Sequence, residues 1–201
     1  MTENLSVTIE NRPIVNNVSF TAASGEVVAL VGASGSGKTT LLNCVGLIRK
    51  PSKGAIVYDG ADFSRIKDKE RTKFWRDHAT FIYQDYGVID DESVAFNVTF
   101  SKFNVDKPRL SAALGAVGLA GRQRDKAAVL SGGEKQRLGI ARSIYKQADV
   151  IFADEPTASL DSANRNMVID LLRARAADGA MVLVATHDER LADACDRVVS
   201  L

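Results

Sequence analysis

The sequence predicts an α/β protein with a mostly parallel sheet at its core, a small antiparallel β subdomain at the N-terminus and an inserted helical lobe. Four mainly apolar runs predict the strands of this sheet. They are residues 27–31, 79–84, 150–153 and 181–186. Strands buried on both faces have such runs, and their alternation with helices is typical of a parallel sheet. Because ligands of such sheets bind at the carboxyl ends of the strands, we expect the site there.

The composition indicates one soluble domain. The chain has 201 residues, of which 45% are hydrophobic and 25% charged. Lys and Arg number 26 against 25 for Asp and Glu, so no net charge attracts nucleic acid. No long apolar run and no signal-like N-terminus occurs, so we expect no direct membrane span. Cys44 and Cys195 match no metal or redox spacing and are expected to be free thiols.

The N-terminal part begins with two short strands, residues 5–9 and 14–20, around a turn at residues 11–13. After the first buried strand and a glycine-rich turn, residues 39–48 read as a helix that ends before Pro51. These two strands form the predicted antiparallel subdomain.

A strand at residues 54–60 and a charged helix at residues 66–77 follow. Phe74 and Trp75 on this helix are expected to pack onto the sheet, and His78 to be structural or exposed. We assign about 1–85 and 130–201 to a core, and about 86–129 to the inserted helical lobe, within one domain.

One more helix is predicted between the last two buried strands. Asp161 is its expected N-cap, and Gly179 fits the C-cap position. Its expected apolar stripe comprises Met167, Val168, Leu171 and Leu172.

Residues 32–40, GASGSGKTT, fit the phosphate-loop pattern G-x-x-x-x-G-K-[ST] between a strand and a helix. Glycines let backbone N–H groups approach phosphate oxygens, and the helix N-terminus favours negative charge. Lys38 would contact the β- and γ-phosphates of ATP, and the Thr39 hydroxyl would bind Mg²⁺. The sequence thus predicts a P-loop NTPase whose ATP contacts are Gly32, Ser34, Gly35, Ser36, Gly37, Lys38, Thr39 and Thr40.

Polar residues at three later strand ends complete this half-site. Asp154 would bind Mg²⁺, and Glu155 would be general base for the attacking water, since neighbouring side chains diverge at a strand end. Alone, such an Asp-Glu pair is usually a solvated helix cap, but the phosphate loop favours catalysis. Gln84 could reach Mg²⁺ or water, and His187 the γ-phosphate, the water or Glu155. The predicted catalytic set is Lys38, Gln84, Glu155 and His187.

Residues 130–137, LSGGEKQR, have the character of a second phosphate cradle, in which a serine and paired glycines precede a helix-forming tail. Ser131, Gly132 and Gly133 are its candidate contacts. Two half-sites that cannot meet within one domain imply a dimer with ATP buried between the subunits.

These motifs, in this order and with ASLD at residues 158–161, resemble the nucleotide-binding domain of ABC (ATP-binding cassette) proteins. The resemblance covers the chain from about residue 5 to its end. It implies a head-to-tail homodimer in which Ser131, Gly132 and Gly133 contact the γ-phosphate of ATP held by the partner subunit. It also implies that Ser159, Leu160 and Asp161 cross the dimer interface.

One position departs from the family pattern. The family places an aromatic residue near the N-terminus to stack on adenine, and the matching position here is Ile9. No Tyr, Phe or Trp precedes Phe20. Because aromatic stacking contributes about 1–3 kcal/mol per base in other settings, we expect Ile9 to offer only a weak apolar contact.

Within the family, VGASGSGKTTLLNCVGLIRKPSKGAI resembles the bacterial subfamily of macrolide exporters, lipoprotein-releasing and cell-division ATPases. The stretch QDYGVIDDESVAFNV resembles bacteriocin-export ATPases. Repair cassettes need a coiled-coil insertion and ribosome-binding cassettes need two cassettes, so neither is expected.

The resemblance implies an ATP-hydrolysing transporter subunit on the cytoplasmic side of the bacterial plasma membrane, driving a separate permease. The alternative is a regulatory cassette that signals to a membrane partner without translocation. The permease would dock between Tyr86 and Val98, where Asp90, Asp91 and Glu92 fit either a docking surface or a solvated turn.

Overall fold

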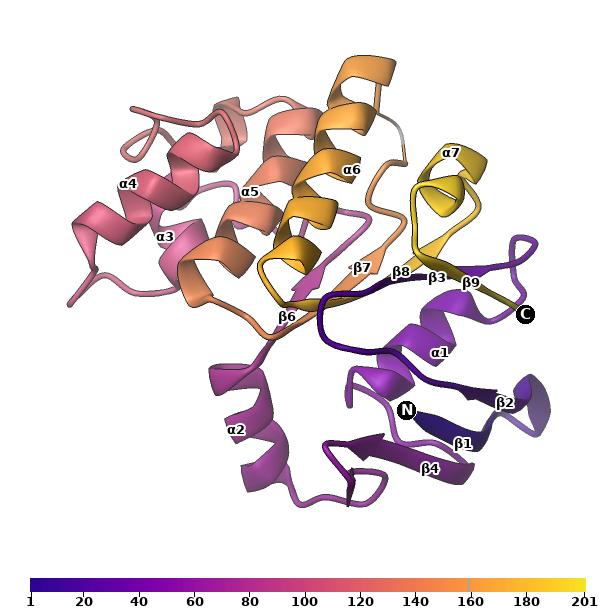
Figure 1. Ribbon diagram of the computed structural model, residues 1–201. Coiled ribbons are helices and arrows are strands. Elements are labelled where there is room, and N and C mark those ends of the chain that lie inside the picture. Colours follow the sequence, from indigo (N-terminus) through magenta and orange to yellow (C-terminus); the bar gives the residue numbers. More distant parts are fainter. Residues whose placement is uncertain (159) are drawn as a thin grey trace.

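The computed structural model describes residues 1–158 and 160–201. Its main sheet is parallel, with the strand order β6-β7-β8-β3-β9 (Figure 1). The strands are β3 (Val27–Val31), β6 (Ala79–Ile82), β7 (Val150–Asp154), β8 (Met181–Thr186) and β9 (Arg197–Ser200). The four predicted strands are therefore confirmed, although β6 ends before Tyr83 and Gln84.

The edge strand β9 was not predicted. Its residues alternate between half-buried and exposed, so it lacks the continuous apolar run of the interior strands. The main sheet consequently extends one strand beyond β3.

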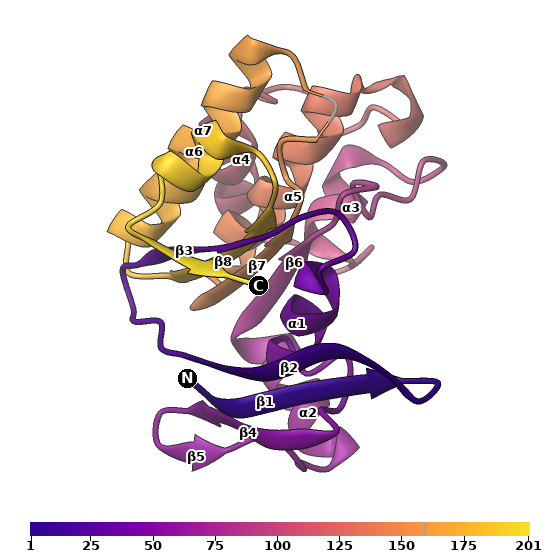
Figure 2. The ribbon, with the colours of Figure 1, turned by 90° about the vertical axis from the view of Figure 1, so that its right-hand side faces the viewer.

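The predicted antiparallel subdomain is confirmed, with the strand order β2-β1-β4-β5 below the main sheet (Figure 2). The strands are β1 (Thr2–Ile9), β2 (Arg12–Phe20), β4 (Lys53–Tyr58) and β5 (Ala61–Asp62). The turn between β1 and β2 is Glu10-Asn11, both with positive φ, rather than residues 11–13. Pro13 belongs to β2, an edge strand where a missing N–H is tolerated.

Helices cover both faces of the main sheet. On one side α1 (Lys38–Val45) lies between the two sheets, with α2 (Asp68–Asp77) nearby (Figures 1 and 2). On the other side lie α5 (Gly132–Lys146) and α6 (Ser162–Ala177). Helix α1 stops earlier than expected because Gly46 caps it and Leu47 takes a positive φ.

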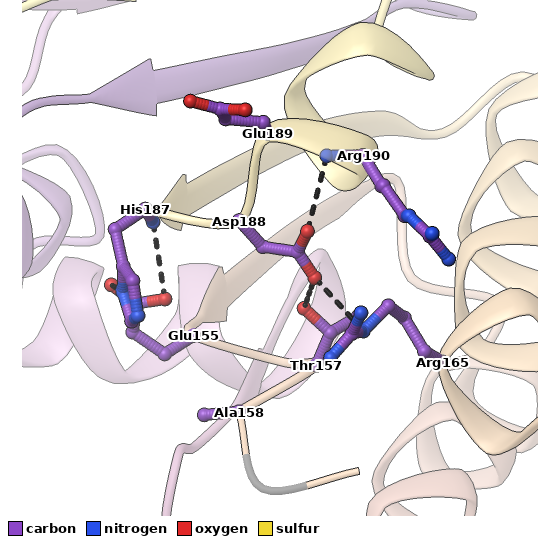
Figure 3. A pocket seen from close by; sticks show the side chains of 8 residues that line it. All are labelled: Glu155, Thr157, Ala158, Arg165, His187, Asp188, Glu189 and Arg190. Carbon is purple, nitrogen blue, oxygen red and sulfur yellow. Dashed lines mark hydrogen bonds and ion pairs between the residues drawn. The ribbon is translucent and has the colours of Figure 1, made fainter. Parts of the chain in front are cut away.

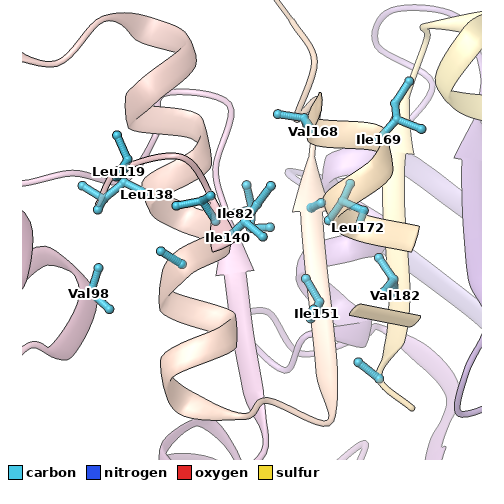
Figure 4. Packing of buried hydrophobic residues seen from close by; sticks show 14 of the residues in the cluster. Ile82, Val98, Leu119, Leu138, Ile140, Ile151, Val168, Ile169, Leu172 and Val182 are labelled. Carbon is cyan, nitrogen blue, oxygen red and sulfur yellow. The ribbon is translucent and has the colours of Figure 1, made fainter. Parts of the chain in front are cut away.

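The helical lobe contributes α3 (Val94–Thr99), α4 (Lys107–Ala116) and the short 3₁₀ helix η1 (Ala127–Val129). Helices α3 and α4 pack beside α5, and Val94, Val98, Leu110 and Leu114 from them join the core on that face of the sheet (Figure 4). A last short helix, α7 (Glu189–Asp193), follows β8.

The alternation of side chains along each central strand supplies two separate cores. In β7, Ile151 faces α5 and α6, whereas Phe152 faces α1 and α2. In β8, Val182 and Leu183 divide in the same way. Both cores therefore hold the strand ends in fixed positions.

Helix α6 has the predicted residues at both of its ends. Asp161 caps α6 through Asn164 N (2.8 Å), and Gly179 follows the C-cap with φ 99°. The predicted apolar stripe of α6 is partly wrong, because Met167 is 43% exposed whereas Ile169 is buried. The buried face of α6 runs along Val168, Ile169, Leu172 and Ala176.

Phe74 is buried, and the Trp75 ring lies 5.9 Å from that of Phe152, so this helix packs onto the sheet as expected. His78 is half-exposed and pairs with Asp149 at 2.7 Å. Cys44 and Cys195 are free. Across the described ranges, the helices lack the combination of length and apolar character that a bilayer span requires.

Phe152 should contribute strongly to stability, because its ring is fully buried beside Trp75 and Phe81. We expect Phe152→Ala to lower the free energy of unfolding by about 3–5 kcal/mol. Met167→Ala should change it by less than about 0.5 kcal/mol, because this side chain is largely exposed. Urea unfolding measures both, and equal losses would contradict the arrangement of the core.

Candidate active site

The phosphate loop follows β3 and leads into α1, as predicted. Gly37 is the N-cap of α1 with φ 97°, no side chain caps the helix, and no acidic residue lies in its first turn. Its first N–H groups are therefore open to an external acceptor, and the helix dipole favours an anion there.

Gly37 is required for two reasons. Its positive φ disfavours any side chain, and a Cβ would lie 2.7 Å from the Ile14 carbonyl oxygen. The loop is thus pressed against β2. Gly35 also has a positive φ (81°), but it faces open space.

A cavity of about 430 Å³ opens over this loop. It brings together most of the predicted half-site, and its lining residues are Ile14, Ser34, Gly35, Gly37, Lys38, Thr39, Thr40, Gln84, Glu155 and His187. Gln84 lies in the turn after β6, two residues beyond the strand end, and still reaches the cavity. Gly32 and Ser36 belong to the loop without lining the cavity, and the buried Ser36 hydroxyl lacks a hydrogen-bond partner among the described residues.

Lys38 is almost fully buried and lies across the loop. Its Nζ donates to the carbonyl oxygens of Gly32 (2.9 Å) and Ala33 (3.2 Å). The same atom lies 3.8 Å from Glu155 Oε1. The ammonium group is therefore held at the cavity between the loop and the end of β7.

Thr39 and Asp154 form a pair of oxygen donors beside this lysine. Thr39 Oγ1 donates to Asp154 Oδ1 at 2.9 Å. Burial raises the pKa of Asp154, and the neighbouring Glu155 acts in the same direction, while the Thr39 hydrogen bond opposes both. Hard oxygens and a carboxylate whose charge is poorly compensated suit a small divalent cation, so the residues present fit Mg²⁺.

The Glu155 and His187 side chains meet where β7 and β8 end (Figure 3). The His187 Nδ1 lies 2.8 Å from Glu155 Oε1, and Glu155 Oε2 accepts from His187 N and Thr186 Oγ1, each at 3.3 Å. Glu155 takes φ 45°, which turns it away from the strand direction of Asp154. The predicted divergence of the two carboxylates is thus present.

The second cradle starts α5. Ser131 is the N-cap, its Oγ accepts from Glu134 N (3.3 Å), and its own N–H donates to Glu134 Oε2 (2.8 Å). Ser131 is exposed, and among the described residues the cavity over the phosphate loop includes none of Ser131, Gly132 and Gly133. The two half-sites are therefore separate within this chain.

The paired glycines also serve packing within the chain. A Cβ at Gly132 would meet the Tyr86 hydroxyl at 2.6 Å, and one at Gly133 would meet the Asn164 side chain at 2.6 Å. Asp161 bonds the same Asn164. Ser159, which the resemblance places at the dimer interface, lies outside the described residues.

Ile9 does not line this cavity, and its contact with adenine stays a prediction. It pairs with Arg12 at the tip of the β1–β2 hairpin, whereas Ile14, two residues further along β2 than Arg12, lines the cavity. Ile14 lies against the phosphate loop, because a Cβ at Gly37 would meet its carbonyl oxygen at 2.7 Å and its Cγ2 atom at 3.2 Å. The sequence also gave no indication of Thr157, Arg165 and Asp188, which surround a second hollow beside Glu155.

A family model described as ABC transporter matches residues 15–158. The macrolide export ATP-binding/permease protein MacB of Shewanella oneidensis is 38% identical over 194 residues, covering 94% of this chain and 30% of that protein. The lipoprotein-releasing system ATP-binding protein LolD of Novosphingobium aromaticivorans is 38% identical over 195 residues, covering 94% and 87%. The chain thus spans under a third of the macrolide export relatives.

Two solved structures extend the comparison. The dimeric structure of MJ0796, a bacterial ABC transporter cassette, is 30% identical with a TM-score of 0.89, covering 100% of this chain and 93% of that one. A post-hydrolysis state of the same cassette bound to ADP and Pi gives a TM-score of 0.88. This chain is therefore similar to that cassette in both fold and sequence.

Ile14 lines the cavity and Ile9 does not, so we expect Ile14 to make an apolar contact with bound ATP. We expect Ile14→Ala to weaken ATP binding about five-fold, the effect of losing roughly 1 kcal/mol of apolar contact. Ile9→Ala is the matched control, and its dissociation constant should stay at the wild-type value. Isothermal titration calorimetry measures both dissociation constants, and a loss of affinity at Ile9 alone would contradict the expectation for Ile14.

Proposed function

This chain belongs to the ABC transporter family, and we propose that it hydrolyses ATP with Glu155 and His187 to drive a membrane permease. The observation that carries the proposal is the contact of these two side chains at the edge of the phosphate-loop cavity. A regulatory cassette that only dimerises would not need a carboxylate held by three donors at that place.

The phosphates would bind at the start of α1. Backbone N–H groups there have no capping side chain, and Lys38 can exchange its two carbonyl partners for phosphate oxygens. Thr39, Asp154 and Gln84 would hold Mg²⁺ between them. When bound, this ion neutralises charge on the phosphates during transfer.

Glu155 is the candidate general base. It would take a proton from water as the water oxygen bonds to the γ-phosphorus and the bond to the β-bridging oxygen breaks, which releases ADP and phosphate. Three hydrogen bonds fix its two oxygens, so little reorganisation is needed. The exposed His187 ring contacts Glu155 and would orient it, and the same ring would contact the γ-phosphate.

The composite site requires a second copy of the chain. Ser131 is exposed at the start of α5 and lies outside this chain's own cavity, so it is free to meet the partner's ATP. A phosphate there would gain from the α5 dipole. Loss of the γ-phosphate on hydrolysis would remove the bridge between the two subunits.

A groove of about 490 Å³ beside the residues from Tyr86 to Val98 supports docking of a permease. Its walls include aromatic side chains and three cations, Arg76, Arg142 and Lys146, and its described lining has no acidic residue. A short amphipathic helix with an acidic side chain would complement it. Asp90 and Glu92 instead pair with Lys135 (2.6 Å) and Lys102 (2.8 Å), so the groove itself is the better docking surface.

This arrangement would place the protein peripherally at the cytoplasmic side of a bacterial plasma membrane, where ATP is available. One relative compared above is a macrolide export ATP-binding/permease protein, and the other is the ATP-binding protein of a lipoprotein-releasing system. The chemical nature of the cargo would be decided by the permease.

Glu155→Gln tests the enzymatic role. We expect kcat for ATP hydrolysis to fall at least about 100-fold, because the general base is lost. ATP affinity should persist, since the phosphate loop is untouched. Phosphate release by the purified protein, alone and with its permease, gives the rate, and unchanged turnover in the variant would refute this role.

Phe100→Glu tests the groove. Phe100 lines it, and its ring lies 4.7 Å from the Arg142 guanidinium, so a carboxylate at position 100 would itself pair with that cation. We expect permease-stimulated hydrolysis to fall about ten-fold with basal hydrolysis unchanged. Phe103→Glu is the control, because Phe103 is 80% exposed and lies outside the groove. Equal stimulation in both variants would exclude docking there.

A further inference from the structure

Phe103 is the most exposed of the large apolar side chains in the described ranges, with an exposed fraction of 80%. It lies in the connection between α3 and α4, residues 100–106, at an outer corner of the helical lobe (Figure 1). Phe100, at the start of the same connection, is 53% exposed. Single exposed apolar residues are common, but two aromatic rings on one short connection indicate a surface that a partner covers.

Hydrogen bonds hold this connection at both ends. Thr99 Oγ1 donates to Ser101 O at 3.0 Å, and Phe103 N donates to Ser101 Oγ at 3.2 Å. At the other end, Asp106 N donates to Tyr145 Oη at 3.2 Å. The Phe103 ring is therefore presented outward by a backbone that the lobe itself holds in place.

The connection separates two hollows of the helical lobe. On one side, Phe100 lines the groove described above for the permease. On the other side, Lys102 and Val105 line a hollow of about 1010 Å³. Phe103 lines neither of them, so it stands on a ridge, residues 100–107, between the two hollows.

The hollow beside the ridge combines apolar walls with excess positive charge. Its apolar lining residues are Ala95, Phe96, Val105 and Leu110. Its cations are Lys102, Lys107 and Arg124. Glu92 is the one acidic residue in its described lining, and it pairs with Lys102 at 2.8 Å. Lys107 and Arg124 are exposed and form no ion pair among the described residues. Exposed aromatic rings thus lie beside uncompensated positive charge.

Helix stability does not account for Lys107. It is the first residue of α4, and the first turn of this helix has no acidic residue. A cation at a helix N-terminus opposes the helix dipole and costs stability. Contact with a negatively charged surface outside the chain would offset this cost.

We propose that the ridge docks on the surface of an anionic phospholipid bilayer. The Phe103 ring inserts at the level of the headgroups, and Lys107 and Arg124 pair with lipid phosphates. The inference rests on the proposed function in one respect. A permease lies within the bilayer, so the groove that receives it faces the membrane, and the ridge adjoins that groove. One ring and two cations give weak, reversible binding, and the permease supplies the remaining affinity.

Cosedimentation of the purified chain with lipid vesicles, without permease, tests the proposal. We expect binding to vesicles of phosphatidylglycerol and phosphatidylcholine, and none to phosphatidylcholine alone. Binding should weaken about ten-fold as salt rises from about 0.05 M to about 0.5 M, because salt screens exposed charges. Phe103→Ser and Lys107→Glu should each lower the partition coefficient at least about five-fold.

Two variants on α6 are matched controls, since this helix lies away from the ridge (Figure 1). Met167→Ser removes an apolar side chain that is 43% exposed, and Arg173→Glu reverses the charge of an exposed cation. Both should bind vesicles like the wild type. All four variants should keep the wild-type melting temperature, because the substituted side chains are largely exposed.

Three results would overturn the proposal. They are absence of wild-type binding to anionic vesicles at low salt, equal binding to both kinds of vesicle, and equal losses in the ridge and α6 variants. If Phe103→Ser instead weakened self-association in lipid-free solution, the ridge would be an interface between copies of the chain, and the lipid proposal would be wrong.

Failure of the proposed function gives a different pattern. Vesicle binding needs neither turnover nor permease, so absent ATP hydrolysis would reject the proposed function and leave the vesicle result to judge the ridge. With permease solubilised in detergent, where no bilayer is present, Phe103→Ser should retain wild-type stimulation of hydrolysis. Loss of that stimulation in detergent would make Phe103 a permease contact and contradict docking on lipid.

Discussion

The contact between Glu155 and His187 is the interaction on which the rest of the site depends. It joins the ends of β7 and β8, which are neighbours in the sheet, and β3 lies next to β8 with its phosphate loop. Parallel pairing brings the three strand ends to one edge, and the two cores keep their register fixed. Lys38, Thr39 and Asp154 then converge without contributions from distant loops. The strand order therefore determines which catalytic residues meet at the site, more than any single motif does.

Sequence alone could predict the residues that lie at ends of buried strands or in the phosphate loop. Continuous apolar runs and a fixed glycine spacing indicate these positions, because both patterns follow from the local structure of the chain. The place of Ile14 at the cavity could not be predicted, because it depends on how the β1–β2 hairpin packs against the phosphate loop. Met167 was misplaced because a helical stripe read from hydrophobicity alone can rotate by one residue.

Asp188 and Arg165 were not foreseeable for a different reason. They lie 23 residues apart and meet only because α6 returns beside the turn after β8. A single acidic residue after a histidine carries no periodic or spacing signal. The paired glycines of the second cradle show the same limit, since their contacts with Tyr86 and Asn164 add an internal packing requirement to the predicted phosphate role.

The central claim is that the phosphate loop of one subunit and Ser131 of another form a single catalytic site. Complementation tests it most directly, by mixing a Lys38→Ala variant with a Ser131→Arg variant and measuring ATP hydrolysis. Each variant alone should be inactive, and the equimolar mixture should recover about a quarter of wild-type activity, since random pairing makes about half of the dimers mixed and each mixed dimer has one intact site. An inactive mixture, or full activity of the Ser131→Arg variant alone, would contradict the account.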